Sequence, residues 1–257
     1  MARPPRFFIS PGQITGQRIA VSGEDVRHIA AVLRMKTGDE LLLCDGQGTE
    51  YQARIEQVSK NEISTEIVSQ SKQALLVPRI TLGQGLPKSD KMDLIVQKAT
   101  ELGVARIVPL ITERTIVKVK DEEKRITRWQ KISREAAMQS NRPDIPIVEN
   151  IRSLRDFILS LDPGPPTLPP GSSGPGTLLL LPWEEGTEPI KKVLRSRHEV
   201  ASVVVLIGPE GGFSAAEAGM ARDKGFHPVS LGPNILRTET AAIATLSMIT
   251  YELQREA

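Results

Sequence analysis

The sequence predicts an α/β protein built from a small β domain over residues 1–73 and a larger parallel-sheet domain over residues 74–257. Residues 1–73 contain short segments of alternating apolar and polar residues separated by turns, which is typical of antiparallel strands. Beyond residue 74 the apolar spacing becomes helical in places, and strand-like and helix-like segments alternate. Two continuous apolar runs, at 178–181 and 203–207, are typical of parallel strands covered on both faces.

Composition narrows the class of protein. The chain has 257 residues, of which 39% are hydrophobic and 25% charged, as in an ordinary folded protein. It has no run of about 18 apolar residues, and only three apolar residues follow the first arginines. We therefore expect neither a membrane span nor a signal peptide, and a cytoplasmic location. Its one cysteine, Cys44, and its three scattered histidines argue against a disulfide and against a metal site.

The first domain is expected to be a small barrel or sandwich. A short helix interrupts its strands: Ser22 to Asp25 can cap it, and Val26, Ile29, Ala30 and Leu33 are spaced to face the core. The expected strands cover residues 6–9, 16–21, 41–44, 51–58 and 63–68.

The second domain is expected to alternate strands and helices. Besides the two apolar runs, strands are predicted at 79–82, 107–111 and 229–231. An amphipathic helix is predicted from Met92 to Leu102, ending at Gly103, and a second one over 125–139. Residues 163–176 hold six prolines and four glycines, so they predict a surface loop inside this domain.

Charge is distributed unevenly along the chain. Residues 1–73 are neutral overall, residues 79–142 carry a net charge of +6, and residues 143–257 carry −4. A basic middle section between neutral and acidic flanks favours an anionic partner for that section, although a solvated helical surface explains the charges equally well.

The sequence places the chemistry in the last 55 residues. The run at 203–207 leads into the turn Gly208–Phe213, and Ser214 to Glu217 form a capping box for the next helix. A second unit follows, with a strand at 229–231, a turn at 232–237 and a helix from about 238 to 254. Glycines around one glutamate at the carboxyl end of a parallel strand suit a ligand crevice. The pattern has no lysine for a phosphate, so an adenosine or amino-acid moiety matches it better.

Two of these segments resemble a known enzyme family. Residues 206–214 and 231–241 are similar to the signature loops of the SPOUT methyltransferases, in particular the ribosomal RNA small subunit methyltransferase E family, which methylates uridine N3 in 16S rRNA. Residues 88–93, 97–103, 112–115 and 135–142 resemble further motifs of that family, and residues 1–73 resemble its PUA-like RNA-binding domain.

The resemblance implies a C-terminal trefoil knot, a homodimer, S-adenosylmethionine as the methyl donor, and 16S rRNA of the 30S ribosomal subunit as the partner. It also implies a donor pocket lined by three loops. Carried over position by position, the cofactor-binding residues are Leu181, Pro182, Glu184, Gly208, Pro209, Glu210, Gly211, Gly212, Leu231, Gly232, Leu236, Arg237 and Thr238. We expect Glu210 to bind the donor, and a Cβ at Gly211 to enter the ligand space.

Uracil N3–H is a weak acid, so methylation at N3 requires loss of that proton. Arg237 is the candidate to stabilise the developing anion, and Glu101 the candidate to accept the proton. Positioning and desolvation without a dedicated base are an alternative. The candidate RNA-binding residues are cations: Arg6, Arg34, Lys88, Lys98, Arg114 and Arg142.

Two other functions stay open at this point. One is a different SPOUT RNA methyltransferase, such as an enzyme that acts on tRNA. The other is a non-catalytic RNA-binding or ribosome-assembly protein that keeps the fold. The presence of all three loop motifs favours an enzyme.

Overall fold

The computed structural model describes residues 4–73, 78–117, 121–161, 176–197 and 200–254. The chain forms two compact units, one from Met1–Leu75 with Ala137–Ile145 and the other from Leu76–Ala136 with Pro146–Ala257. The first unit is therefore built from two stretches of sequence and not from the N-terminal residues alone. The predicted proline-rich loop lies outside the described residues except for Gly176, which begins a strand.

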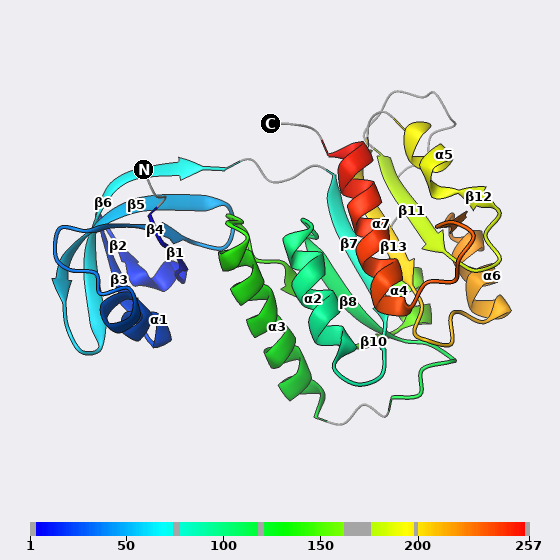
Figure 1. The fold of residues 1–257 in the computed structure, drawn as a ribbon, viewed down its shortest axis with the longest axis horizontal. Helices are drawn as coiled ribbons and strands as arrows, with labels where there is room; N and C mark the ends of the chain where they lie inside the picture. The colour runs from blue at the N-terminus through cyan, green and yellow to red at the C-terminus, as the bar shows by residue number, and fades with distance from the viewer. Residues whose placement is uncertain (1–3, 74–77, 118–120, 162–175, 198–199, 255–257) are drawn as a thin grey trace. The chain divides into compact units, whose positions relative to one another are not determined.

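The first unit is a curled, mainly antiparallel sheet, as predicted (Figure 1). Its strand order is β1-β4-β5-β6-β3-β2, and among the pairings described within this sheet only β1–β4 is parallel. The strands are β1 (Arg6–Phe8), β2 (Ile14–Thr15), β3 (Arg18–Ser22), β4 (Glu40–Cys44), β5 (Thr49–Val58) and β6 (Glu62–Lys72), with a short 3-10 turn η1 (Pro11–Gln13) before β2.

The predicted short helix is present but differs in its start and its inner face. It comprises α1 (Glu24–Arg27) and a π-helical turn η2 (His28–Val32), and it starts at Gly23 without a side-chain cap. The Leu33 N–H donates to the His28 carbonyl at 2.9 Å, a bond that spans five residues. This wider turn rotates the later side chains away from the core. Leu33, expected inside, is 41% exposed, whereas Ile29 is fully buried.

The second unit contains the predicted parallel sheet. Every strand pairing found among its described residues is parallel, in the order β10-β8-β7-β13-β11-β14-β12, with β9 paired to β8. The strands are β7 (Arg79–Gly85), β8 (Arg106–Ile111), β9 (Ile147–Val148), β10 (Arg152–Ser153), β11 (Gly176–Pro182), β12 (Glu188–Pro189), β13 (Val200–Ile207) and β14 (His227–Ser230).

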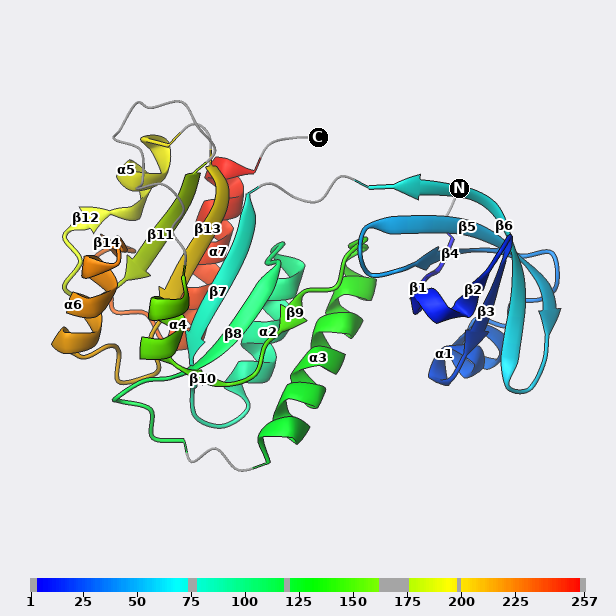
Figure 2. The same cartoon turned by 180° about the vertical axis from the view of Figure 1, so that it is seen from behind.

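Helices cover both faces of this sheet, as Figures 1 and 2 show from opposite sides. The central strands are buried on both faces because their successive side chains enter different cores: Val203 and Val205 pack on one face, Val204 and Leu206 on the other. The first face is covered by α2 (Lys91–Glu101), α3 (Glu122–Gln139), α5 (Ile190–Arg195) and α7 (Thr238–Leu253), and the second by α4 (Leu154–Ser160) and α6 (Ala215–Asp223).

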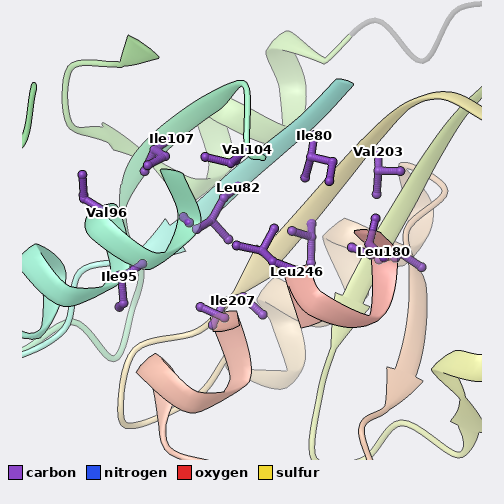
Figure 3. Packing of buried hydrophobic residues seen from close by; sticks show 14 of the residues in the cluster. Ile80, Leu82, Ile95, Val96, Val104, Ile107, Leu180, Val203, Ile207 and Leu246 are labelled. Carbon is purple, nitrogen blue, oxygen red and sulfur yellow. The ribbon is translucent and has the colours of Figure 1, made fainter. Parts of the chain in front are cut away.

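The larger core lies between the sheet, α2 and α7. In Figure 3, Ile95 of α2, Leu82 of β7 and Leu246 of α7 converge on the same apolar region. All three side chains are completely buried. This packing holds the start of α7 beside the ends of the central strands, which is where the predicted loops emerge.

The predicted helix ends are confirmed where local side chains define them. Ser214 accepts a hydrogen bond from the Glu217 N–H at 3.2 Å, and the Glu217 carboxylate accepts one from the Ser214 N–H at 2.9 Å. This reciprocal pair is the predicted capping box of α6. At the end of α2, Gly103 adopts a φ of 89°, a left-handed conformation that favours glycine.

Candidate active site

Three loops meet at the carboxyl ends of β11, β13 and β14. Helix α6 leaves β13 towards one face of the sheet, and α7 leaves the β14 loop towards the other. Loops that diverge in this way leave a crevice above the strand ends. A cavity of about 490 Å³ lies there, within the size range of small-molecule sites.

All but one of the predicted cofactor-binding residues line this cavity. Leu181 is the exception, since it is buried inside the α4–α6 core. The lining positions are Pro182, Glu184, Gly208, Pro209, Glu210, Gly211, Gly212, Leu231, Gly232, Leu236, Arg237 and Thr238. Trp183 of the first predicted loop also lines the cavity, and so does Lys91, which sequence reasoning did not place there. Lys91 follows β7, which the sequence predicted as a strand. Because the carboxyl ends of parallel strands share one edge of a sheet, the position of Lys91 after that strand was the available signal.

A chain of hydrogen bonds fixes the glycine-rich turn against its neighbours. The Thr238 hydroxyl donates to the Gly208 carbonyl at 2.6 Å, and the Gln84 amide nitrogen donates to Thr238 Oγ1 at 3.0 Å. Gln84 is fully buried in β7, and its Nε2 also donates to the Gly85 carbonyl at 2.9 Å. The turn after β13, the end of β7 and the start of α7 are therefore joined through one hydroxyl group.

The Glu184 carboxylate lies against the glycine-rich turn from the first loop. Gly212 has a φ of 66°, and a Cβ at that position would lie 3.0 Å from Glu184 Oε1. Glycine is needed there both for the left-handed backbone and for this close approach. The carboxylate thus stands at the cavity wall beside the glycine-rich turn.

Glu210 faces α2. Its Oε1 accepts hydrogen bonds from the Lys88 N–H at 3.0 Å and from Lys91 Nζ at 2.9 Å, and Lys91 Nζ lies 3.4 Å from Glu239 Oε2. Burial raises the pKa of Glu210, but the bonds from Lys91 and from backbone N–H groups outweigh it and hold that pKa below its usual value. Hydrogen bonding to Glu210 raises the pKa of Lys91, which therefore stays protonated.

Gly211 packs against the loop after β8. Arg114 donates from Nη1 to the Gly211 carbonyl at 2.7 Å, and a Cβ at Gly211 would lie 3.0 Å from Arg114 Cβ. The expectation that this Cβ would enter the ligand space is wrong, because it points at Arg114. The buried Glu217 supports the same loop by accepting a hydrogen bond from the Glu113 N–H at 2.8 Å.

Comparisons with known proteins agree with this architecture. A model of the RNA methyltransferase domain matches residues 74–250, and a model of the RNA methyltransferase PUA domain matches residues 21–68. The chain is 31% identical over 263 residues to the ribosomal RNA small subunit methyltransferase E of Bacillus subtilis, with 97% of each protein covered. The chain belongs to the ribosomal RNA small subunit methyltransferase E family.

Two solved structures resemble the whole chain. The methyltransferase E of Neisseria gonorrhoeae bound to S-adenosyl methionine is 31% identical with a TM-score of 0.82, covering 96% of this chain and 97% of that one. A putative methyltransferase from Legionella pneumophila in complex with the cofactor SAM is 32% identical with a TM-score of 0.84, covering 99% and 100%. The match to the PUA domain model agrees with the curled sheet of the first unit.

The two predicted catalytic residues of this family member lie in different places. Arg237 is exposed, lines the cavity and immediately precedes α7, and no partner of its guanidinium is found among the described residues. Glu101 is the last residue of α2 and pairs with Lys98 at 2.8 Å. Glu101 does not line the cavity, and ten residues of helix place it about 15 Å along the axis from Lys91.

The predicted RNA-binding cations divide into buried and exposed groups. Arg6 forms an ion pair with Glu50 at 2.6 Å and donates to the Arg142 carbonyl at 2.9 Å, while Arg142 pairs with Asp144 at 2.9 Å. The side chains of Arg6 and Arg142 are only 10% and 7% exposed. The structure therefore places both in the interior of the first unit, where partners already neutralise them, and not on a surface that RNA can reach.

The other four predicted cations are accessible. Arg34 and Lys88 are exposed, and the exposed Arg114 lies beside the glycine-rich turn. Lys98 is half-buried and held by Glu101. Of these residues, Lys88 and Arg114 belong to segments that contact the turn at 208–212.

Within the described parts of the chain, no helix combines the length and apolarity that a membrane crossing requires.

Proposed function

We propose that this protein transfers a methyl group from S-adenosylmethionine to N3 of one uridine in 16S rRNA of the small ribosomal subunit. One observation carries the proposal: the loops after β11, β13 and β14 line a single cavity in a chain that belongs to the methyltransferase E family. The solved relatives bound to S-adenosylmethionine support the choice of donor.

The cavity suits that donor in size and in the groups that it offers. Backbone groups of the turn at 208–212 and of Leu231 and Gly232 line it, and they can hold the polar edge of an adenine. Leu236 adds an apolar wall, and Glu184 brings a carboxylate to a ligand that carries positive charge. When bound, S-adenosylmethionine supplies an electrophilic methyl group on a sulfonium.

We assign charge stabilisation to Arg237. Arg237 lines the cavity, and its guanidinium can donate hydrogen bonds to negative charge that develops on the uracil oxygens as N3 loses its proton. Glu101 of the same chain is too far from the cavity to take that proton, and the protonated Lys91 cannot accept one. We therefore assign neither Glu101 nor Lys91 as the base, and the contribution assigned to this chain is stabilisation of the developing anion by Arg237.

We place the RNA on the exposed cations. Lys88 and Arg114 flank the glycine-rich turn, and both belong to the basic middle section of the sequence. Arg34 is the candidate in the first unit, where it is exposed next to the exposed Val32 and Leu33. Contacts of this kind position a nucleic acid through its phosphates.

We also propose that the protein is a homodimer that buries part of α7, and that its C-terminal region is knotted, as the family resemblance implies. Among the exposed large hydrophobic side chains of the described residues, Ile235 in the loop before α7 and Tyr251 on α7 have the highest exposed fractions, 89% and 88%. Since the proposed substrate is the ribosomal subunit, we place the enzyme in the cytoplasm.

The proposal is tested by incubating the protein with 30S particles and S-adenosylmethionine labelled in its methyl group, and then mapping the modified nucleotide. Label at N3 of one uridine is the expected result. Label on tRNA alone would overturn the proposal in favour of another RNA methyltransferase activity. RNA binding with no label on any RNA would indicate a non-catalytic protein.

A further inference from the structure

Lys91 occupies an unusual position between two loops of the cavity. It is the first residue of α2, and its ammonium lies 2.9 Å from Glu210 Oε1 and 3.4 Å from Glu239 Oε2. Glu210 belongs to the turn after β13, and Glu239 is the second residue of α7, two positions after Arg237. A single cation thus contacts two carboxylates that are 29 residues apart in the sequence. One carboxylate is in the turn after β13 and the other is on α7.

The two carboxylates depend on this cation to different degrees. Glu210 also accepts the Lys88 N–H, so it keeps one donor if Lys91 is removed. Glu239 Oε2 is buried and accepts no hydrogen bond among the described residues, which leaves the ion pair with Lys91 as its compensation. Without the ammonium, the two carboxylates would lose the cation between them, and their repulsion would push the turn at 208–212 away from the start of α7.

We propose that Lys91 is a positioning residue: its charge holds the turn at 208–212 and the start of α7 at the separation that the donor cavity requires. The proposal rests on the proposed function only for the identity of the ligand. Lys91 acts through Glu210 and Glu239, and no contact between Lys91 and the substrate is invoked. Its side chain is 29% exposed, so the pair is shielded enough from solvent to have an effect.

The first experiment measures S-adenosylmethionine affinity by calorimetry for Lys91→Met, which keeps the length of the side chain and removes its charge. We expect affinity to fall about tenfold, the effect of losing one charge-assisted hydrogen bond. Lys91→Arg should retain most of the affinity. Lys192→Met is the matched control: Lys192 of α5 forms an exposed ion pair with Glu188 of β12 at 3.1 Å, and this variant should bind the donor as wild type does.

A second variant separates charge from mere loss of packing. The double variant Lys91→Met with Glu239→Gln also removes the carboxylate that Lys91→Met leaves uncompensated. Its affinity for S-adenosylmethionine should therefore be at least threefold higher than that of Lys91→Met. A purely structural defect would make the double variant bind no better than Lys91→Met. Wild-type affinity in Lys91→Met, or no recovery in the double variant, would overturn the proposal.

A third measurement does not need the ligand. Amide hydrogen exchange of the free protein should quicken in both 208–213 and 236–241 in Lys91→Met, and in neither segment in Lys192→Met. Unchanged exchange in both segments of Lys91→Met would overturn the coupling even if its affinity for the donor falls as expected. If wild type fails to bind S-adenosylmethionine while exchange responds as expected, the proposed function fails and the role of Lys91 stands.

Discussion

Replacing Gly85 with alanine should damage the cavity specifically. Gly85 ends β7, and a Cβ at this position would lie 2.5 Å from Pro209 Cδ, 2.6 Å from Pro209 N and 3.0 Å from Gly208 C. These are backbone or ring atoms that cannot rotate away. Restoring Pro209 Cδ to an ordinary contact of 3.4 Å needs a displacement of about 0.9 Å of the turn that follows β13.

The consequences follow from that displacement. A shift of this size, passed to Gly208, is enough to break the 2.6 Å bond from Thr238 to the Gly208 carbonyl. Overpacking in a core costs about 1–3 kcal/mol, which corresponds to a Tm lower by roughly 2–12 °C for a protein of this size. We expect affinity for S-adenosylmethionine to fall about tenfold or more, equivalent to about 1.4 kcal/mol.

Gly83→Ala provides the matched comparison. Gly83 lies on the same strand, but its added Cβ would meet only core side chains, at 2.7 Å from Leu206 Cδ2 and 3.0 Å from Leu110 Cδ1. This variant should lose similar thermal stability, measured by calorimetric unfolding, and keep the affinity of its folded form within about twofold. If Gly85→Ala is destabilised yet binds the donor as wild type does, the geometry of the turn is not what limits binding.

Three further outcomes are expected. Thr238→Val leaves the Gly208 carbonyl and the buried Gln84 amide without their shared partner, so the free energy of unfolding measured with denaturant should fall by about 1–3 kcal/mol. Thr238→Ser keeps the hydroxyl and should stay near wild type. Equal stability of the two variants would exclude the hydroxyl's role. Burial and the charge of Arg197 lower the pKa of His227 below 6.5 despite Glu188, so the unfolded chain takes up the proton first and stability should fall as pH drops below about 6.5. His227→Gln should flatten this slope in pH-dependent thermal unfolding, and a slope that survives the substitution would assign it to another group. Arg34→Gln should weaken RNA binding and reduce the salt dependence of log Kd by about 0.7–0.9 without changing donor affinity; an unchanged salt slope would remove Arg34 from the interface.

Much of the fold was predictable because its signals are local. The apolar run at 203–207 is β13, and its continuous hydrophobicity follows from burial on both faces of a parallel sheet. The capping box at Ser214 needs only two residues three positions apart. The helix after Gly23 was the exception, since the π-helical turn that exposes Leu33 leaves no mark in the apolar spacing.

The candidate site divides in the same way. The cavity-lining residues of the three loops were predictable, because each loop is one continuous segment of the sequence. The burial of a cation by an ion pair was not predictable. Arginines are usually surface residues, but Glu50 neutralises Arg6 and Asp144 neutralises Arg142 in the interior of the first unit. Likewise, the direction in which a Cβ at Gly211 points depends on Arg114, which is 97 residues away in the chain.

By itself, the amino-acid order determined which segments are strands, which are helices, and which turns carry glycine, because these preferences arise between neighbours a few residues apart. Only the tertiary structure decided which charges are compensated, and Lys91 illustrates the reason. Its partners Glu210 and Glu239 are more than a hundred residues away in the chain, and Coulomb attraction depends on their separation in space, which packing of α2 and α7 on the sheet sets.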